Sequence, residues 1–73
     1  MYTTTNFKTK TALKNAVKAG EQVTVFQPND MFGQNQKLST FTGTQYIEGP
    51  HYPEPHKWYA TVKMVNGIVV KVA

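Results

Sequence analysis

The chain has 73 residues and no cysteine, and eight lysines against four acidic residues give it a net charge of +4. This length allows one small domain, which buries only about 60% of its unfolded surface. The lack of cysteine excludes disulfides and thiolate metal sites. No apolar run approaches the roughly 20 residues that span a bilayer, and residues 1–6 lack the features of a signal peptide. We expect one soluble, cytoplasmic domain over residues 1–73, with residues 1–6 frayed.

The excess positive charge is concentrated at the N-terminal end. The first twenty residues contain no acid and four lysines, Lys8, Lys10, Lys14 and Lys18. The other four lysines are balanced by the four acidic residues, and the chain has no arginine. Lysine is a point charge that suits phosphates or acidic patches, but it lacks the bidentate fork used to read bases.

Residues 9–19 have the period of an amphipathic helix. Thr9 is the expected N-cap and Gly20 the expected left-handed residue after the helix. A narrow apolar stripe is formed by Ala12, Leu13, Ala16 and Val17. On another face, Lys10, Lys14 and Lys18 recur every four residues and form a basic ridge. The ridge is either a solvated face or a contact for phosphate.

Strand patterns follow the helix. Residues 21–27 alternate up to Pro28 and predict a strand, and residues 28–37 predict a polar loop. The loop contains Met31 and Phe32, which either tuck under the domain as a lid or stand out as a contact, and we expect them to tuck under. Residues 38–42 and 44–48 predict two short strands around a turn at Gly43.

The C-terminal part of the chain predicts a hairpin. Residues 57–65 alternate, with Trp58, Ala60, Val62 and Met64 on the core face, and Asn66-Gly67 is a turn signal. A two-residue loop pairs Val65 with Ile68 and carries Lys63 opposite Val70. A three-residue loop pairs Met64 with Ile68 and gathers the apolar residues on one face. We expect the three-residue loop, with Gly67 in a G1 bulge.

Between these strands lies the stretch Gly-Pro-His-Tyr-Pro-Glu-Pro-His-Lys-Trp-Tyr, residues 49–59. It holds three of the four prolines, both histidines and the only tryptophan. Proline restricts its own φ and that of the preceding residue, so residues 50–55 predict a stiff, extended connector. Such a loop presents side chains at little entropic cost. It is either a rigid link closed by Trp58 or a contact whose exposed partner-binding residues are His51, Tyr52, Glu54, His56 and Tyr59.

The same stretch invites a metal or catalytic interpretation. Imidazole and carboxylate bind zinc, and His51, Glu54 and His56 supply both. An extended path, however, separates the histidines by about 15 Å at about 3.1 Å per residue. No serine, cysteine or second carboxylate is placed beside them by sequence for acid–base or nucleophilic work. We expect no metal, no cofactor and no enzymatic activity.

The chain has more aromatic side chains than one small core easily hides: Phe26, Phe32, Phe41, Tyr46, Tyr52, Trp58 and Tyr59. Tyrosine and tryptophan are enriched at protein interfaces and also stack on single-stranded nucleic acid. A nucleic-acid-binding module that uses Lys8, Lys10, Lys14 and Lys18 is therefore the alternative to a protein-binding one. The lack of arginine and of RNP-type motifs weakens this alternative.

Three segments of this chain resemble those of short accessory proteins of tailed bacteriophages and prophages. They are the 49–59 motif, the Asn66-Gly67 hairpin, and the helix Thr-Ala-Leu-Lys-Asn-Ala-Val-Lys-Ala-Gly that runs into Glu-Gln-Val-Thr-Val-Phe. The resemblance covers residues 7–73 and carries no catalytic motif. It implies a protein that binds and modulates a host or phage component in the bacterial cytoplasm.

Together these patterns predict an α+β fold, with one N-terminal helix packed on a four- to five-stranded antiparallel sheet that could curl toward a barrel. The predicted function is a non-enzymatic interaction protein of phage type. Its expected partner is a protein with an acidic patch.

Overall fold

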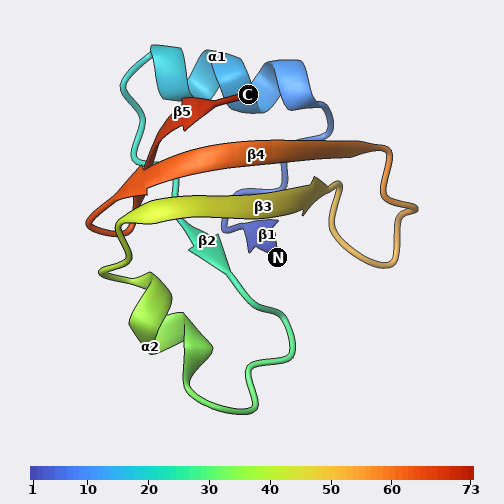
Figure 1. Ribbon diagram of the computed structural model, residues 1–73. Coiled ribbons are helices and arrows are strands. Elements are labelled where there is room, and N and C mark those ends of the chain that lie inside the picture. The colour runs from blue at the N-terminus through green and yellow to red at the C-terminus, as the bar shows by residue number, and fades with distance from the viewer.

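Five strands and two helices follow one another in the computed structural model, which describes residues 1–73 (Figure 1). The elements are β1 (Tyr2–Thr3), α1 (Lys10–Lys18), β2 (Val25–Phe26), α2 (Gln34–Leu38), β3 (Gly43–Gly49), β4 (Trp58–Val65) and β5 (Ile68–Val72). The expected α+β class is confirmed. The strands are divided between two antiparallel sheets, however, β1-β2 and β3-β4-β5, rather than joined in one sheet of four or five.

Single backbone hydrogen bonds connect the two sheets. The Glu48 N–H donates to the Met1 carbonyl over 3.1 Å, at the free edge of β3, and the Val69 N–H donates to the Val23 carbonyl over 2.8 Å, at the free edge of β5. The N-terminal segment and the segment before β2 therefore lie beside the two edges of the larger sheet.

The N-terminal residues are ordered, so the prediction of a frayed tail over residues 1–6 is wrong. Tyr2 pairs with Phe26 and Thr3 with Val25, and both β1 residues are buried. The physical reason is the aromatic ring of Tyr2, which finds apolar surroundings that a threonine-rich composition does not reveal.

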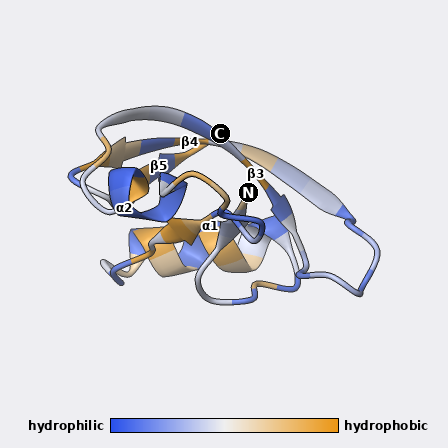
Figure 2. Ribbon diagram, turned by 90° about the horizontal axis from the view of Figure 1, so that it is seen from below, coloured by the Kyte–Doolittle hydropathy of each residue, from blue (hydrophilic) through white to orange (hydrophobic).

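Helix α1 forms as its sequence predicts. The Thr9 hydroxyl accepts the Ala12 N–H over 3.1 Å, and Gly20 has a φ of +80° just beyond the helix. Leu13 and Ala16 are buried, and the helix packs on β5 and β4. In Figure 2, α1 lies along one side of the β3-β4-β5 sheet and no helix covers the other.

The core lies between the sheet and α1. Along β4 the predicted face, Trp58, Ala60, Val62 and Met64, is buried, as expected. It packs with residues from both helices, from β2 and the segment before it, and from β3 and β5: Leu13, Ala16, Val23, Val25, Leu38, Ile47 and Val69. The opposite face of the sheet is open to solvent, where Tyr46 and Tyr59 are 72% and 64% exposed.

The β4–β5 hairpin has a two-residue loop, so the predicted three-residue register is wrong. Val65 pairs with Ile68 and Met64 with Val69, and a bulge then shifts the register so that Lys63 pairs with Lys71. The bulge leaves Val70 and Lys71 both exposed and restores the pairing of Val62 with Val72. Asn66 and Gly67 have φ values of +50° and +83°, as a type I′ turn requires.

The middle of the chain departs furthest from the prediction. The strand expected over residues 21–27 is limited to β2, and α2 replaces the end of the expected 28–37 loop and the beginning of the expected 38–42 strand. The Asp30 carboxylate accepts the N–H groups of Gln34 and Asn35 and so caps α2. The Asn35 side chain accepts the Gln27 N–H and donates to the Gln27 carbonyl, which holds α2 against the end of β2.

Candidate functional site

The proline-rich loop between β3 and β4 doubles back on itself. The Lys57 N–H donates to the Gly49 carbonyl over 2.7 Å and the Glu54 N–H to the His51 carbonyl over 3.1 Å. The Gly49–Pro50 and Tyr52–Pro53 peptide bonds are cis. Because the two hydrogen bonds close the loop on itself, the expectation of an extended connector is wrong. Because β3 and β4 are antiparallel neighbours paired as far as Gly49 and Trp58, the intervening chain must reverse its direction.

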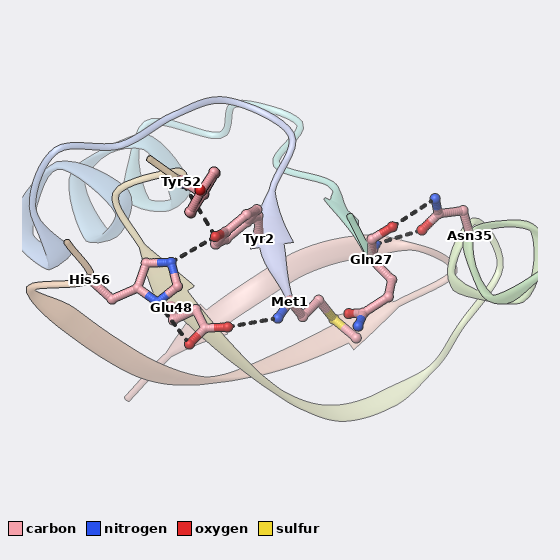
Figure 3. Close-up of polar contacts among 7 residues, drawn as sticks. All are labelled: Met1, Tyr2, Gln27, Asn35, Glu48, Tyr52 and His56. Carbon is pink, nitrogen blue, oxygen red and sulfur yellow. Dashed lines mark hydrogen bonds and ion pairs between the residues drawn. The ribbon is translucent and has the colours of Figure 1, made fainter. Parts of the chain in front are cut away.

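Tyr2, on β1, is the residue that anchors this loop (Figure 3). Its hydroxyl lies 2.7 Å from His56 Nε2 and accepts the Tyr52 N–H over 3.2 Å. Its ring stacks on the His51 imidazole with centroids 4.8 Å apart, and it meets the His56 and Phe26 rings edge-on. One buried phenol thus holds three loop residues.

His56 connects Tyr2 to β3. Its Nδ1 lies 3.2 Å from Glu48 Oε2, and Glu48 Oε1 lies 3.2 Å from the Met1 ammonium group. A carboxylate can only accept hydrogen bonds, so the neutral ring carries its proton on Nδ1, and Nε2 accepts the Tyr2 hydroxyl proton. The chain of contacts runs from the N-terminus through Glu48 and His56 to Tyr2 (Figure 3).

His51 is held by backbone groups of the N-terminal segment. Its Nε2 lies 2.7 Å from the Thr3 carbonyl oxygen, which requires the ring to donate from Nε2. Its own N–H donates to the Asn6 side-chain oxygen over 2.9 Å. Both histidines are partly buried, so the prediction that they stand substantially exposed is wrong. Because an imidazole has an apolar body and two polar atoms, the Tyr2 ring and the nearby acceptors hold it inward.

Two of the predicted contact residues do face solvent at the tip of this loop. Tyr52 is 80% exposed, and the exposed Glu54 carboxylate accepts a hydrogen bond from Lys8 Nζ over 2.9 Å. This bond, together with the Coulomb attraction of Lys8 and the weaker attraction of Lys57, lowers the pKa of Glu54 against a small opposing effect of desolvation. The loop tip is thus tied to the segment that precedes α1.

A second loop lies beside the first. Tyr52, Tyr2, Pro28 and Asn29 line a hollow of about 300 Å³. Just beyond Asn29, Met31 and Phe32 are each 79% exposed. They do not tuck under the domain as predicted, because the core is filled by Leu38 of α2 instead. We call the exposed residues 28–32 and 52–55 the two-loop face.

Tyr59 does not belong to the two-loop face, although the sequence places it near the loop. It lies on the open face of the sheet, where it lines a different hollow with Tyr46 and Lys10. The alternation of β4 explains the separation, since Trp58 points into the core and Tyr59 away from it.

The four candidate nucleic-acid contacts are also divided by the structure. Lys8 pairs with Glu54, whereas Lys10, Lys14 and Lys18 make no ion pair. Lys14 and Lys18 line a groove between α1 and β5.

Sequence reasoning missed the roles of Tyr2, Glu48, Met31 and Phe32. Tyr2 is the single aromatic residue in a threonine-rich segment, and this isolation was the available signal. The contact of Glu48 with Met1 had no signal, because it joins residues 47 positions apart.

The buried polar atoms of this region all have hydrogen-bond partners, so the cluster around Tyr2 works as a clamp. No group of three or more His, Cys, Asp or Glu side chains is arranged to hold a metal ion. None of the helices is long and apolar enough to cross a membrane. Comparisons with protein-family models, curated proteins and solved structures find no match to this chain.

Proposed function

We propose that this chain is a non-enzymatic interaction protein that binds a protein partner through the two-loop face. The observation that carries the proposal is the position of the most exposed large hydrophobic side chains. Met31, Phe32 and Tyr52 are 79%, 79% and 80% exposed, and all three lie on the two loops that share one hollow. Exposed apolar patches on small proteins mark interaction sites, and buried aromatic anchors carry most of the binding energy of an interface.

The clamp around Tyr2 supports this proposal because it fixes the loop before a partner arrives. The Tyr52 N–H is bound by the Tyr2 hydroxyl, and the flanking His51 and His56 are held by the N-terminal segment and by β3. A loop that is already ordered loses little conformational entropy on binding. The exposed Tyr52 side chain therefore projects from a loop whose backbone is already held in place.

The charge beside the loop suggests the chemistry of the partner. Lys8, Lys57 and Glu54 line a shallow hollow with two prolines, Pro50 and Pro55. Two ammonium groups against one carboxylate favour a partner whose apolar contact segment is flanked by acidic residues. The resemblance to phage accessory proteins supports a host or phage macromolecule as that partner, in the cytoplasm of the bacterial host.

Replacement of the exposed anchors tests the proposal. The partner is first captured from nuclease-treated bacterial lysate, purified and titrated by isothermal calorimetry. Phe32→Ser and Tyr52→Ser should each weaken its binding by about 30-fold or more, the scale of an interface hot spot. The control is Val65→Ser, which removes an exposed hydrophobic side chain from β4. Binding that survives both loop variants but is lost in the Val65 variant would overturn the proposal.

A further inference from the structure

Most of the lysine side chains of this protein form no ion pair. Lys8 is the only lysine in an ion pair. Glu48 is occupied by Met1 and His56, and Asp30 caps α2. The uncompensated charges therefore include those on one side of the fold, where α1 runs beside β5 (Figure 1).

A basic groove follows this line of contact. It has a volume of about 350 Å³ and is lined by Lys14, Val17, Lys18, Val70, Lys71 and Val72. Three ammonium groups and three valines meet there without any acidic side chain. Lys71 is also paired across the sheet with Lys63, an arrangement of like charges that destabilises a sheet unless an anion offsets it.

A second hollow, which shares no lining residue with the groove, lies at the open face of the sheet. This hollow of about 360 Å³ is lined by Lys10, Tyr46, Glu48, Tyr59, Thr61 and Ala73, together with Ile47 and Ala60. Lys10 is one helical turn before Lys14, and Ala73 directly follows Val72, so the two hollows adjoin along both α1 and β5. The lysines at positions 10, 14 and 18 are spaced about 6 Å apart along the helix axis.

The groove and the adjoining hollow together are called the track below. Tyr46 and Tyr59 provide an aromatic platform at one end of it. Tyr46 pairs with Thr61, and Glu48 pairs with Tyr59, so the two tyrosines are diagonal neighbours on one face, about 7–8 Å apart at their backbones. Both rings are largely exposed. The one acidic side chain in this hollow, Glu48, is already bound by Met1 and His56.

We propose that this track binds single-stranded nucleic acid, with phosphates along Lys10, Lys14, Lys18 and Lys71 and bases stacked on Tyr46 and Tyr59. Positively charged grooves combined with stacking aromatics are the recurring design of proteins that bind single strands. Lysine supplies charge without reading base edges, so binding depends little on sequence. The proposal is independent of the two-loop face, with which the track shares no residue.

The first test measures the salt dependence of binding. Fluorescence anisotropy follows the intact chain with labelled oligo(dT) and oligo(rU) of about 12 nucleotides. Four phosphate contacts predict that log K falls with log salt concentration with a slope of about −3, and Lys14→Gln, Lys18→Gln or Lys71→Gln should each reduce this slope by about 0.7. Lys37→Gln, the matched control on α2, should leave it unchanged. Comparison of the two affinities separates DNA from RNA as the strand that is bound more tightly.

The second test separates stacking from charge. Tyr46→Ala and Tyr59→Ala should each weaken binding to oligo(dT) about tenfold, and should have no effect on an abasic strand of the same length. Circular dichroism verifies that each variant is folded. No binding at low salt overturns the proposal, and so does equal loss of affinity from Lys37→Gln and from the groove variants. Equal binding of the abasic and normal strands overturns the aromatic part.

Discussion

At the scale of single residues, the Tyr2 hydroxyl has the largest number of distant partners. It contacts His56 and accepts the Tyr52 N–H, and the ring around it is buried. Removal of the oxygen leaves two polar groups without their partner while the aromatic ring can remain in place. Such unsatisfied groups cost more than the net value of the hydrogen bond that is lost.

Tyr2→Phe should therefore lower the free energy of unfolding by about 1–3 kcal/mol. Urea denaturation followed by tryptophan fluorescence measures the change, because Trp58 is buried in the core. Tyr59→Phe, at an exposed position, is the control and should shift stability by about 0.5 kcal/mol or less. Equal stability of the two variants would show that the clamp does not hold the loop.

Glu54 and Lys8 allow a residue-scale test of electrostatics. The ammonium group of Lys8 stabilises the charged carboxylate and lowers the pKa of Glu54. A depressed pKa in the folded state contributes stability above the ordinary pKa of glutamate and loses it as the pH falls through the lowered value. Because both side chains are exposed, the contribution to stability is small.

Lys8→Gln should raise the pKa of Glu54 toward its ordinary value, as measured by NMR titration of the side-chain carboxyl carbon. Lys10→Gln removes one positive charge from α1, which forms no ion pair with Glu54, and should leave the pKa of Glu54 unchanged. If the pKa of Glu54 is the same in wild type and Lys8→Gln, the ion pair is absent in solution.

At the scale of elements, the β4–β5 turn is fixed by Gly67. Its φ is +83°, and an added Cβ would overlap the Ser39 backbone carbonyl at the end of α2. Gly20 has a similar φ of +80° but no atom within 4 Å of an added Cβ. Substitution of each glycine by alanine therefore distinguishes two causes of destabilisation. Both positions have the unfavourable backbone conformation, but only Gly67 also has the steric overlap.

Gly20→Ala should destabilise the domain by about 1–2 kcal/mol, and Gly67→Ala by about 2–5 kcal/mol because strain from overpacking is added. Thermal and urea unfolding of the two variants give the comparison. Similar losses in both would indicate that the turn can move away from Ser39.

The elements differ in how well their sequences predicted them. Helix α1 has a cap, an apolar stripe and a terminal glycine, and β4 has strict alternation, so local patterns were sufficient. Helix α2 has five residues, too few to show a period, and its formation depends on Asp30 and on contacts with Gln27. The hairpin register was predicted wrongly because the prediction assumed a regular ladder of strand pairs. In the structure, a bulge beyond the two-residue turn shifts the register and so returns the apolar residues to one face.

At the scale of the whole molecule, the location of the candidate site was predictable and its geometry was not. The unusual composition of residues 49–59 correctly drew attention to the loop. The inward orientation of His51 and His56, however, depends on a strand from the other end of the chain. A local pattern cannot reveal such pairs, because their partners are decided by topology.

The clamp has a consequence for the order in which the protein folds. Tyr2 and His56 are 54 positions apart, and Met1 and Glu48 are 47 positions apart. During synthesis, therefore, β1 leaves the ribosome well before Glu48 and His56, whereas the backbone hydrogen bonds of α1 join residues that are close in sequence. Closing so long a loop costs entropy that only non-local contacts repay. The residues of β1 are thus among the last to be buried.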